Sequence, residues 1–173
     1  MKKYLGAVAA AALVLGGASS AMAAQASASV TASAVVVTPI TESVTTNMNF
    51  GKLVMNASNS TGTVVLTQSN TRSAGGTGVD LVGGTGGVSA VVHFVGDTTN
   101  GGNSAYNVTI DSTATLNDPG NVHSMSVTSI GTTDQTTGLV GAQDVHIGAT
   151  LNAAANQAAG SYQGSFNVTA AYQ

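Results

Sequence analysis

The chain has 173 residues, a formal net charge of −3 and only 6% charged residues. It contains no cysteine, which excludes disulfides, thiol nucleophiles and thiolate metal sites. Two of its four cationic residues are Lys2 and Lys3, so Lys52 and Arg72 alone face seven acidic residues along the rest of the chain. This balance excludes the basic surface on which nucleic-acid binding depends.

Residues 1–23 have the pattern of a secretory signal peptide. Lys2 and Lys3 form the charged start, Leu5–Leu15 is an apolar run, and Ala21–Ala23 is a small-x-small cleavage site. The apolar run is too short for a membrane-spanning helix. We therefore expect export through the inner membrane to the periplasm, the cell surface or the medium. The mature chain would have no membrane span, and its 150 residues suit one domain.

The segment that follows, residues 24–34, alternates without interruption between apolar and polar side chains. Alternation with a period of two is typical of a β-strand that has one apolar face. We assign residues 24–35 to an N-terminal extension and residues 36–173 to the domain. The apolar face of the extension consists of Ala26, Ala28, Val30, Ala32 and Ala34.

Short apolar runs separated by clusters of Gly, Asn, Asp and Ser fill the rest of the chain. Val88–Val95 is apolar on both faces, which predicts a central strand. Ser73–Gly87 and Asn100–Ser104 are predicted loops, and residues 153–159 form either one helical turn or a loop. Seven to nine short strands predict an all-β fold, an immunoglobulin-like antiparallel β-sandwich. The other predicted strands are Met48–Val54, Thr63–Thr67, Tyr106–Ile110, Met125–Ile130 and Val145–Leu151.

Residues 160–173 carry the clearest strand pattern in the chain. Polar side chains occupy the odd positions from Ser161 to Thr169, and the even positions are apolar or glycine. Three of the aromatic residues that follow the predicted signal peptide lie in this stretch, which predicts a strand packed on the core. The even positions with Gly160 form the predicted C-terminal motif: Gly160, Tyr162, Phe166, Val168, Ala170 and Tyr172.

No pattern in the sequence predicts catalysis. The glycines between Gly75 and Gly87 lack the Gly-Lys-Ser/Thr ending of a phosphate loop, and no Gly-x-Ser-x-Gly elbow is present. His93, His123 and His146 lack the spacing of metal ligands; we expect His146 to face solvent and His123 to be partly buried. Asp111–Asp118 departs from the EF-hand loop and suits turn capping. We predict a non-enzyme without catalytic residues, cofactor or metal.

These features resemble chaperone–usher pilins. Such pilins end with a penultimate tyrosine, here Tyr172, and have a glycine fourteenth from the C-terminus, here Gly160. Met48–Gly51 is similar to the Asn-Phe-Gly element of archaic, spore-coat-U-like domains. The mature chain also resembles an uncharacterised family of secreted bacterial β-domains, which share this element and a Gly-x-Tyr-x-Gly-x-Phe-x-Val-x-x-x-Tyr ending. Many pilins carry a disulfide, which this chain lacks.

The resemblance implies a mechanism of assembly. The immunoglobulin-like fold of these pilins lacks its final strand, which exposes a hydrophobic groove. A periplasmic chaperone fills the groove first, and the N-terminal extension of the next subunit then replaces it, with an outer-membrane usher as the third partner. Residues 24–34 would be the donor strand, and Tyr162–Tyr172 would line the groove. The resemblance thus implies a structural subunit of a surface fimbria.

Two alternatives stay open from the sequence. Residues 24–34 could fold back onto their own domain, which would give a self-contained secreted surface-coat protein. The domain could instead be a carbohydrate- or Ca²⁺-binding module that uses its long polar loops. The sequence alone does not separate insertion of residues 24–34 into the same chain from insertion into a neighbouring one.

Overall fold

A computed structural model describes residues 26–56, 60–83, 86–99 and 104–173 of the chain. The chain divides into two units, Met1–Ala34 and Val35–Gln173. The predicted signal peptide lies outside the described residues. Within the described residues no helix is present, so none has the length and apolar character to cross a membrane.

The described part of Val35–Gln173 is built from eleven β-strands. They are short, apart from two long strands near the middle of the fold, and every strand pair is antiparallel. The first six strands are β1 (Thr41–Thr46), β2 (Leu53–Met55), β3 (Gly62–Leu66), β4 (Arg72–Gly76), β5 (Val79–Leu81) and β6 (Ala90–Val95). The other five are β7 (Tyr106–Ile110), β8 (Ala114–Asn117), β9 (Ser124–Gly131), β10 (Ala142–Ala153) and β11 (Val168–Tyr172).

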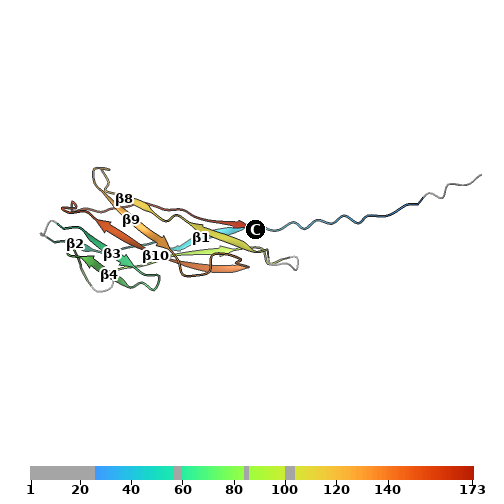
Figure 1. Ribbon diagram of the computed structural model, residues 1–173, viewed down its shortest axis with the longest axis horizontal. Coiled ribbons are helices and arrows are strands. Elements are labelled where there is room, and N and C mark those ends of the chain that lie inside the picture. The colour runs from blue at the N-terminus through green and yellow to red at the C-terminus, as the bar shows by residue number, and fades with distance from the viewer. Residues whose placement is uncertain (1–25, 57–59, 84–85, 100–103) are drawn as a thin grey trace, which may run out of the picture. The chain divides into compact units, whose positions relative to one another are not determined.

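The long strand β10 organises the largest sheet. Its first half pairs with β6, and its second half pairs with β3 on one edge and β9 on the other. The sheet continues outward through β6 to β1, through β3 to β4, and through β9 to β8. Figure 1 shows β8, β9 and β10 following one another across the domain. Two further pairs, β11 with β7 and β2 with β5, complete the fold.

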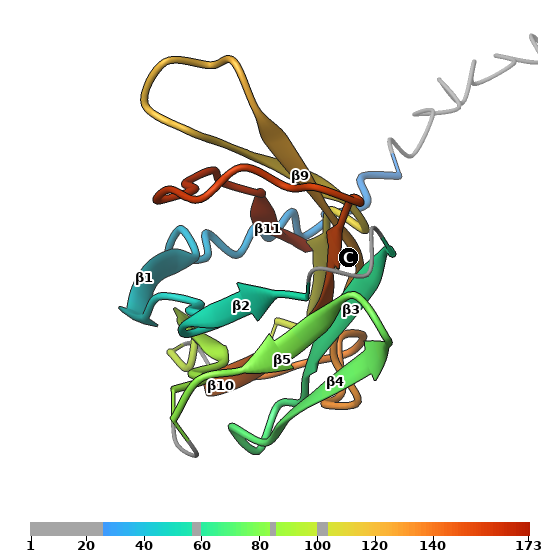
Figure 2. The same cartoon turned by 90° about the vertical axis from the view of Figure 1, so that its left-hand side faces the viewer.

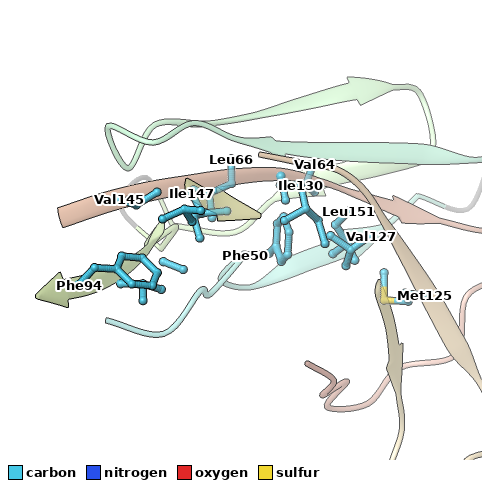
Figure 3. Close-up of a cluster of buried hydrophobic side chains, with 14 of the residues drawn as sticks. Phe50, Val64, Leu66, Phe94, Met125, Val127, Ile130, Val145, Ile147 and Leu151 are labelled. Carbon is cyan, nitrogen blue, oxygen red and sulfur yellow. The ribbon is translucent and has the colours of Figure 1, made fainter. Parts of the chain in front are cut away.

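The core forms where the apolar faces of these strands meet. Strand β10 alternates as its sequence predicts, because Val145, Ile147 and Leu151 are buried while His146 is exposed. Figure 3 shows Ile147 and Leu151 among side chains from the other strands, with Phe50 between them. Aromatic packing extends the core toward the other sheet, where the rings of Phe94 and Tyr106 lie 6.4 Å apart. The prediction of an all-β antiparallel sandwich is confirmed.

Several strands lie where the sequence predicts them. Val88–Val95 was expected to be central, and β6 does pair with β1 on one edge and β10 on the other. The predicted strand Met48–Val54 is shorter in the structure. Only β2 is a regular strand there, and Asn49 forms an isolated bridge with Val88.

Two expectations are wrong. Ser73–Gly87 was predicted as a loop, yet it contains most of β4 and all of β5. Ala26–Ala34 was predicted as a strand, yet every one of these residues is exposed and outside any regular element. The alternating pattern is necessary for a half-buried strand, but a strand also needs a neighbour to satisfy its backbone groups. The open choice for residues 153–159 is settled as a turn, in which Gln157 N donates to Ala154 O.

Candidate strand-binding groove

An elongated groove of about 1590 Å³ opens in the domain Val35–Gln173. This volume exceeds the 300–1,000 Å³ or so that is typical of small-molecule pockets. One rim follows β1 and the segment Asn47–Met55, and the other follows Gln157–Val168. Side chains from four strands form the floor between the rims: Ala90, Val92, Ala114, Leu116, Met125, Val127 and Leu151.

The first rim is an edge strand. Strand β1 pairs with β6 through one edge, and among the described residues it ends the strand order of its sheet. Its side chains are exposed up to Thr45, and Val44, which lines the groove, is 62% exposed. A sheet edge of this kind presents N–H and C=O groups that can pair with another strand.

The second rim leads into an edge strand, β11, of which Val168 lines the groove. Gln173 N donates to Ala105 O, which fixes the odd positions as those that bond toward β7. Since antiparallel strands bond at alternate residues, the backbone groups of Val168, Ala170 and Tyr172 point the other way. Among the described residues β11 pairs with β7 alone. Figure 2 shows β1 and β11 as separate strands. The open edge of β1 therefore borders the groove, and the open edge of β11 begins where the second rim ends, at Val168.

The predicted C-terminal motif alternates in the structure as it does in the sequence. The apolar even positions are half-buried, while the odd positions from Ser161 to Gln173 are exposed. The half-buried side chains that pack against the core are Tyr162, Phe166, Val168, Ala170 and Tyr172. Gly160 differs from these, because it is exposed and a Cβ there would meet only the Tyr162 ring, at 3.9 Å.

The Asn-Phe-Gly element forms a sharp corner within the first rim, in the segment Asn47–Met55. The Asn49 side-chain oxygen accepts a hydrogen bond from Gly51 N at 2.7 Å, which closes a tight turn. Gly51 adopts a φ of +74°, a left-handed conformation that favours glycine. The turn directs Phe50 into the core, where it is 8% exposed and lies beneath the groove.

Arg72 fastens this corner to the rest of the domain. Its guanidinium donates to Phe50 O at 2.9 Å, to Lys52 O at 3.0 Å and to Val82 O at 2.7 Å. It also donates to Gly83 O. The five donors of a guanidinium suit such a cluster of carbonyls, so Arg72 holds the Asn-Phe-Gly corner and the segment after β5 together. The sequence pattern contains no signal of this role.

Gly164 lets the second rim approach β8. Gln163 and Asn117 form a bridge with N–O distances of 2.9 and 2.8 Å, and a Cβ at position 164 would overlap the carbonyl oxygen of Thr115. Gly164→Ala should therefore lower the free energy of unfolding by about 1–3 kcal/mol, the usual cost of overpacking. Urea titration checks the change. Gly160→Ala is the matched control, because the space at position 160 is open, and equal losses for both variants would contradict this account.

Two tyrosine hydroxyls fix the ends of the C-terminal segment Tyr162–Tyr172. Tyr162 donates to Ala158 O at 2.7 Å and accepts from Gln157 Nε2 at 2.8 Å, which closes the turn before the rim. At the other end, Tyr172 donates to Thr38 O at 2.8 Å and accepts from Asp97 N at 2.7 Å. Tyr172 thus bonds to two segments that are remote in sequence.

The predicted donor residues belong to the other unit of the chain. Ala26, Ala28, Val30, Ala32 and Ala34 are all exposed, and every residue that lines the groove lies between Glu42 and Val168. The structure therefore brings Gly160, Tyr162, Phe166 and Val168 of the predicted C-terminal motif to the groove. Ala170 and Tyr172 lie outside its lining, as do the predicted donor residues. Sequence reasoning missed the floor residues from β8 and the roles of Arg72 and Gly164.

A comparison with protein-family models returned one match, described as "Domain of unknown function (DUF4402)", which spans residues 39–172. The chain belongs to this family. Searches of curated proteins and of solved structures returned no significant match. The matched range of this DUF4402 domain contains both rims and the whole floor of the groove.

The groove of this DUF4402 domain is poor in titratable groups. Glu42 and Lys52 are the charged residues among those that line it, and they stand on one rim. The apolar floor between two open sheet edges can therefore offer backbone hydrogen bonds and apolar contact to an extended peptide.

The three histidines of the DUF4402 domain each pair with an aspartate outside the groove lining. The Nδ1–Oδ distances are 2.6 Å for His93–Asp144, 2.9 Å for His123–Asp118 and 3.0 Å for His146–Asp134. His146 is exposed as expected, but the expectation that His123 is partly buried is wrong, because it stands on the exposed end before β9. The described residues contain no group of three or more His, Asp or Glu that could hold a metal ion.

The predicted turn role of Asp111–Asp118 holds at Asp118, whereas Ala114–Asn117 form strand β8 and Asp111 bonds to the remote Asn167. Asp111 Oδ2 accepts from Asn167 N at 2.9 Å, and Asp118 Oδ1 accepts from Val122 N at 2.8 Å. The hydrogen bond from His123 holds the pKa of Asp118 below its usual value, against the opposite effect of burial. Both carboxylates are therefore occupied by the chain itself.

Two pKa shifts mark the region around Tyr172. The hydrogen bond from the Thr99 hydroxyl, supported by that from Thr38, holds the pKa of the buried Asp97 below its usual value, although burial acts in the opposite direction. Burial raises the pKa of Tyr106, and the neighbouring Tyr172 adds to this shift. Asp97 is thus a carboxylate at ordinary pH and can accept hydrogen bonds from the groups around it.

Proposed function

We propose that this protein is a structural subunit of a surface fimbria that assembles by donor-strand complementation. The observation that carries the proposal is the groove, whose apolar floor lies beside the edge of β1 and leads to the edge of β11, both unpaired among the described residues. In an immunoglobulin-like sandwich this is the space that a final strand would fill. A strand entering the groove would complete the fold.

The N-terminal extension has the chemistry that such a groove requires. Residues 24–34 number eleven, as do the residues of the C-terminal segment from Tyr162 to Tyr172. The apolar face from Ala26 to Ala34 would meet the groove floor, while the polar face would remain in solvent. The extension carries no charged side chain, so its burial leaves no charge unpaired.

Backbone pairing would supply most of the binding free energy. Each hydrogen bond along the strand contributes about 0.5–1.5 kcal/mol net. Each buried alanine methyl adds about 0.8 kcal/mol, less than a leucine or phenylalanine would. The interaction would therefore depend on a long ladder of main-chain bonds and would tolerate small side chains at each position that enters the groove.

The implied partners follow from this mechanism. Identical or related subunits would exchange donor strands, a periplasmic chaperone would cover the groove before assembly, and an outer-membrane usher would guide export. The groove lining supports a role in binding and not in catalysis, since its charged side chains are limited to Glu42 and Lys52.

Electrophoresis of the purified exported protein in SDS, with and without boiling, tests the proposal. Donor-strand exchange between chains predicts a ladder of polymers that boiling collapses to one band. Insertion of residues 24–34 into the same chain predicts a single compact monomer that expands on boiling. A monomer whose stability and mobility are unchanged by deletion of residues 24–34 would contradict both modes of strand insertion.

A further inference from the structure

A closed set of hydrogen bonds joins three strand ends beyond the end of the groove. Tyr172 of β11 donates to Thr38 O and accepts from Asp97 N, at 2.8 and 2.7 Å. The ring closes where Thr38 Oγ1 donates to Asp97 Oδ1 at 3.0 Å. Thr38 precedes β1 and Asp97 follows β6, so the three residues tie the ends of β1, β6 and β11 together.

The surroundings of this cluster are well packed. Asp97 is 1% exposed, and its Oδ1 also accepts from the Thr99 hydroxyl at 2.7 Å. The Tyr172 ring meets the buried Tyr106 ring edge-on, with their centres 6.5 Å apart. Tyr106 in turn donates to Gly141 O at 3.1 Å. Packing of the Tyr172 ring against Tyr106 therefore fixes the position of the Tyr172 hydroxyl.

Thr38 lies close along the chain to the predicted donor segment. Ala34 is the last residue of the predicted donor face, and four residues of chain span at most about 14 Å. Tyr172 therefore binds the backbone close to the point from which the N-terminal segment extends. It also belongs to β11, whose outward-facing backbone groups extend the edge along which a donor strand would pair.

We propose that Tyr172 is a latch that couples occupancy of the groove to the anchoring of the N-terminal segment of the same subunit. This inference rests on the proposed function. A donor strand that pairs with β11 orders its backbone, which holds the Tyr172 hydroxyl on Thr38 and Asp97. A subunit whose groove is filled therefore presents its own donor segment from a fixed point. Coupling of this kind is reciprocal, so anchoring Thr38 also favours the ordered form of β11.

The Asp97 amide provides a direct readout, because its N–H donates to Tyr172. We would measure amide hydrogen exchange by NMR in the full exported chain. Tyr172→Phe keeps the ring and removes the hydroxyl, and should speed exchange at Asp97 by at least about tenfold, as expected for loss of one hydrogen bond of about 1.4 kcal/mol. Thr133→Val is the control, since it also removes a hydroxyl donor, whose bond to Gln68 Oε1 at 2.6 Å lies outside the groove lining and this cluster.

A synthetic peptide of residues 24–34 then tests the coupling. In the unaltered protein and in Thr133→Val, the peptide should slow exchange at Val168, Ala170 and Asp97 together. In Tyr172→Phe it should protect Val168 and Ala170 while Asp97 stays unprotected. Equal protection of Asp97 in all three proteins, or no effect of Tyr172→Phe without peptide, would overturn the latch.

The same data separate the latch from donor-strand binding. If the peptide leaves Val168 and Ala170 unchanged in every protein, donor-strand binding fails, and the coupling role of Tyr172 is overturned with it. If these two amides are protected but Asp97 does not respond in the unaltered protein, donor-strand binding stands and only the latch is wrong. Thr38→Val, which removes the hydroxyl donor to Asp97 but keeps the carbonyl, should retain part of the coupling.

Discussion

Val30→Asp is expected to reduce polymer yield on the order of a hundredfold. Val30 lies at the centre of the apolar face of residues 24–34, so the variant would place a carboxylate over the groove floor. Burial of an unpaired charge costs several kcal/mol, and about 2.7 kcal/mol already corresponds to a hundredfold change in binding. The residue is 91% exposed and belongs to the unit Met1–Ala34, so the domain itself should keep its stability.

The neighbouring residue supplies the control for this experiment. Thr31→Asp introduces the same charge at the next position, on the opposite face of a strand. Its polymer yield, measured by densitometry of unboiled SDS gels, should stay within about twofold of the unaltered protein, as for an exposed charge. Equal losses from the two variants would contradict insertion of a one-sided strand, because they would show that net charge and not facing direction governs assembly.

Phe50→Ala is expected to lower the free energy of unfolding by about 3–5 kcal/mol, the usual cost of removing a buried phenylalanine. Phe50 is 8% exposed and packs between the strands that carry Ile147, Leu151 and Val127 (Figure 3). It also follows the turn that Asn49 and Gly51 close, so its loss empties the space beneath one rim of the groove.

Urea denaturation followed by circular dichroism measures this change. Val54→Ala is the control, because Val54 also lines the groove but is 49% exposed, and its truncation should cost less than about 1 kcal/mol. A loss below about 1 kcal/mol for Phe50→Ala would show that the Asn-Phe-Gly corner does not anchor the core. An unchanged m-value would indicate that the unfolded state is unaltered.

Alternation allowed the strands with one buried face to be predicted from the sequence. The local sequence alone shows the alternation of Val145, Ile147 and Leu151 in β10. It also shows the alternation at the even positions of Tyr162–Tyr172. The strand β11 could therefore be predicted, although Tyr162–Asn167, predicted as part of the same strand, keeps the alternation outside any regular strand. Its neighbour could not, because pairing with β7 depends on which backbone edges remain available after folding.

The Gly-rich strands β4 and β5 could not be predicted from side-chain patterns. In these strands glycine allows close approach of the backbone, as at Gly75 of β4, where a Cβ would lie 2.5 Å from Thr63 Oγ1. They are also held by Arg72, whose carbonyl partners lie 10 to 22 residues away in sequence. Glycine in such a stretch predicts a loop by composition, and only the tertiary contacts make it a strand.

The contacts of Tyr172 were equally inaccessible to sequence reasoning. Its motif position marks it as important by resemblance, but its partners Thr38 and Asp97 are single polar residues that lie 134 and 75 positions away. Nothing in their local sequence distinguishes them from other threonines and aspartates. The floor residues Ala114 and Leu116 are similar, because a four-residue strand is too short to show a period.

The hydrogen bonds of Arg72 also determine which site in the folded protein is accessible to a protease such as trypsin. Trypsin cuts after lysine and arginine. Beyond the predicted signal peptide the sequence offers it only Lys52 and Arg72. The guanidinium of Arg72 is already engaged by four carbonyl oxygens, so the exposed Lys52 is the accessible cleavage point. Lys52 stands on the groove rim. Resistance of the folded protein to trypsin would therefore show in a single assay whether a strand covers the groove beside Lys52.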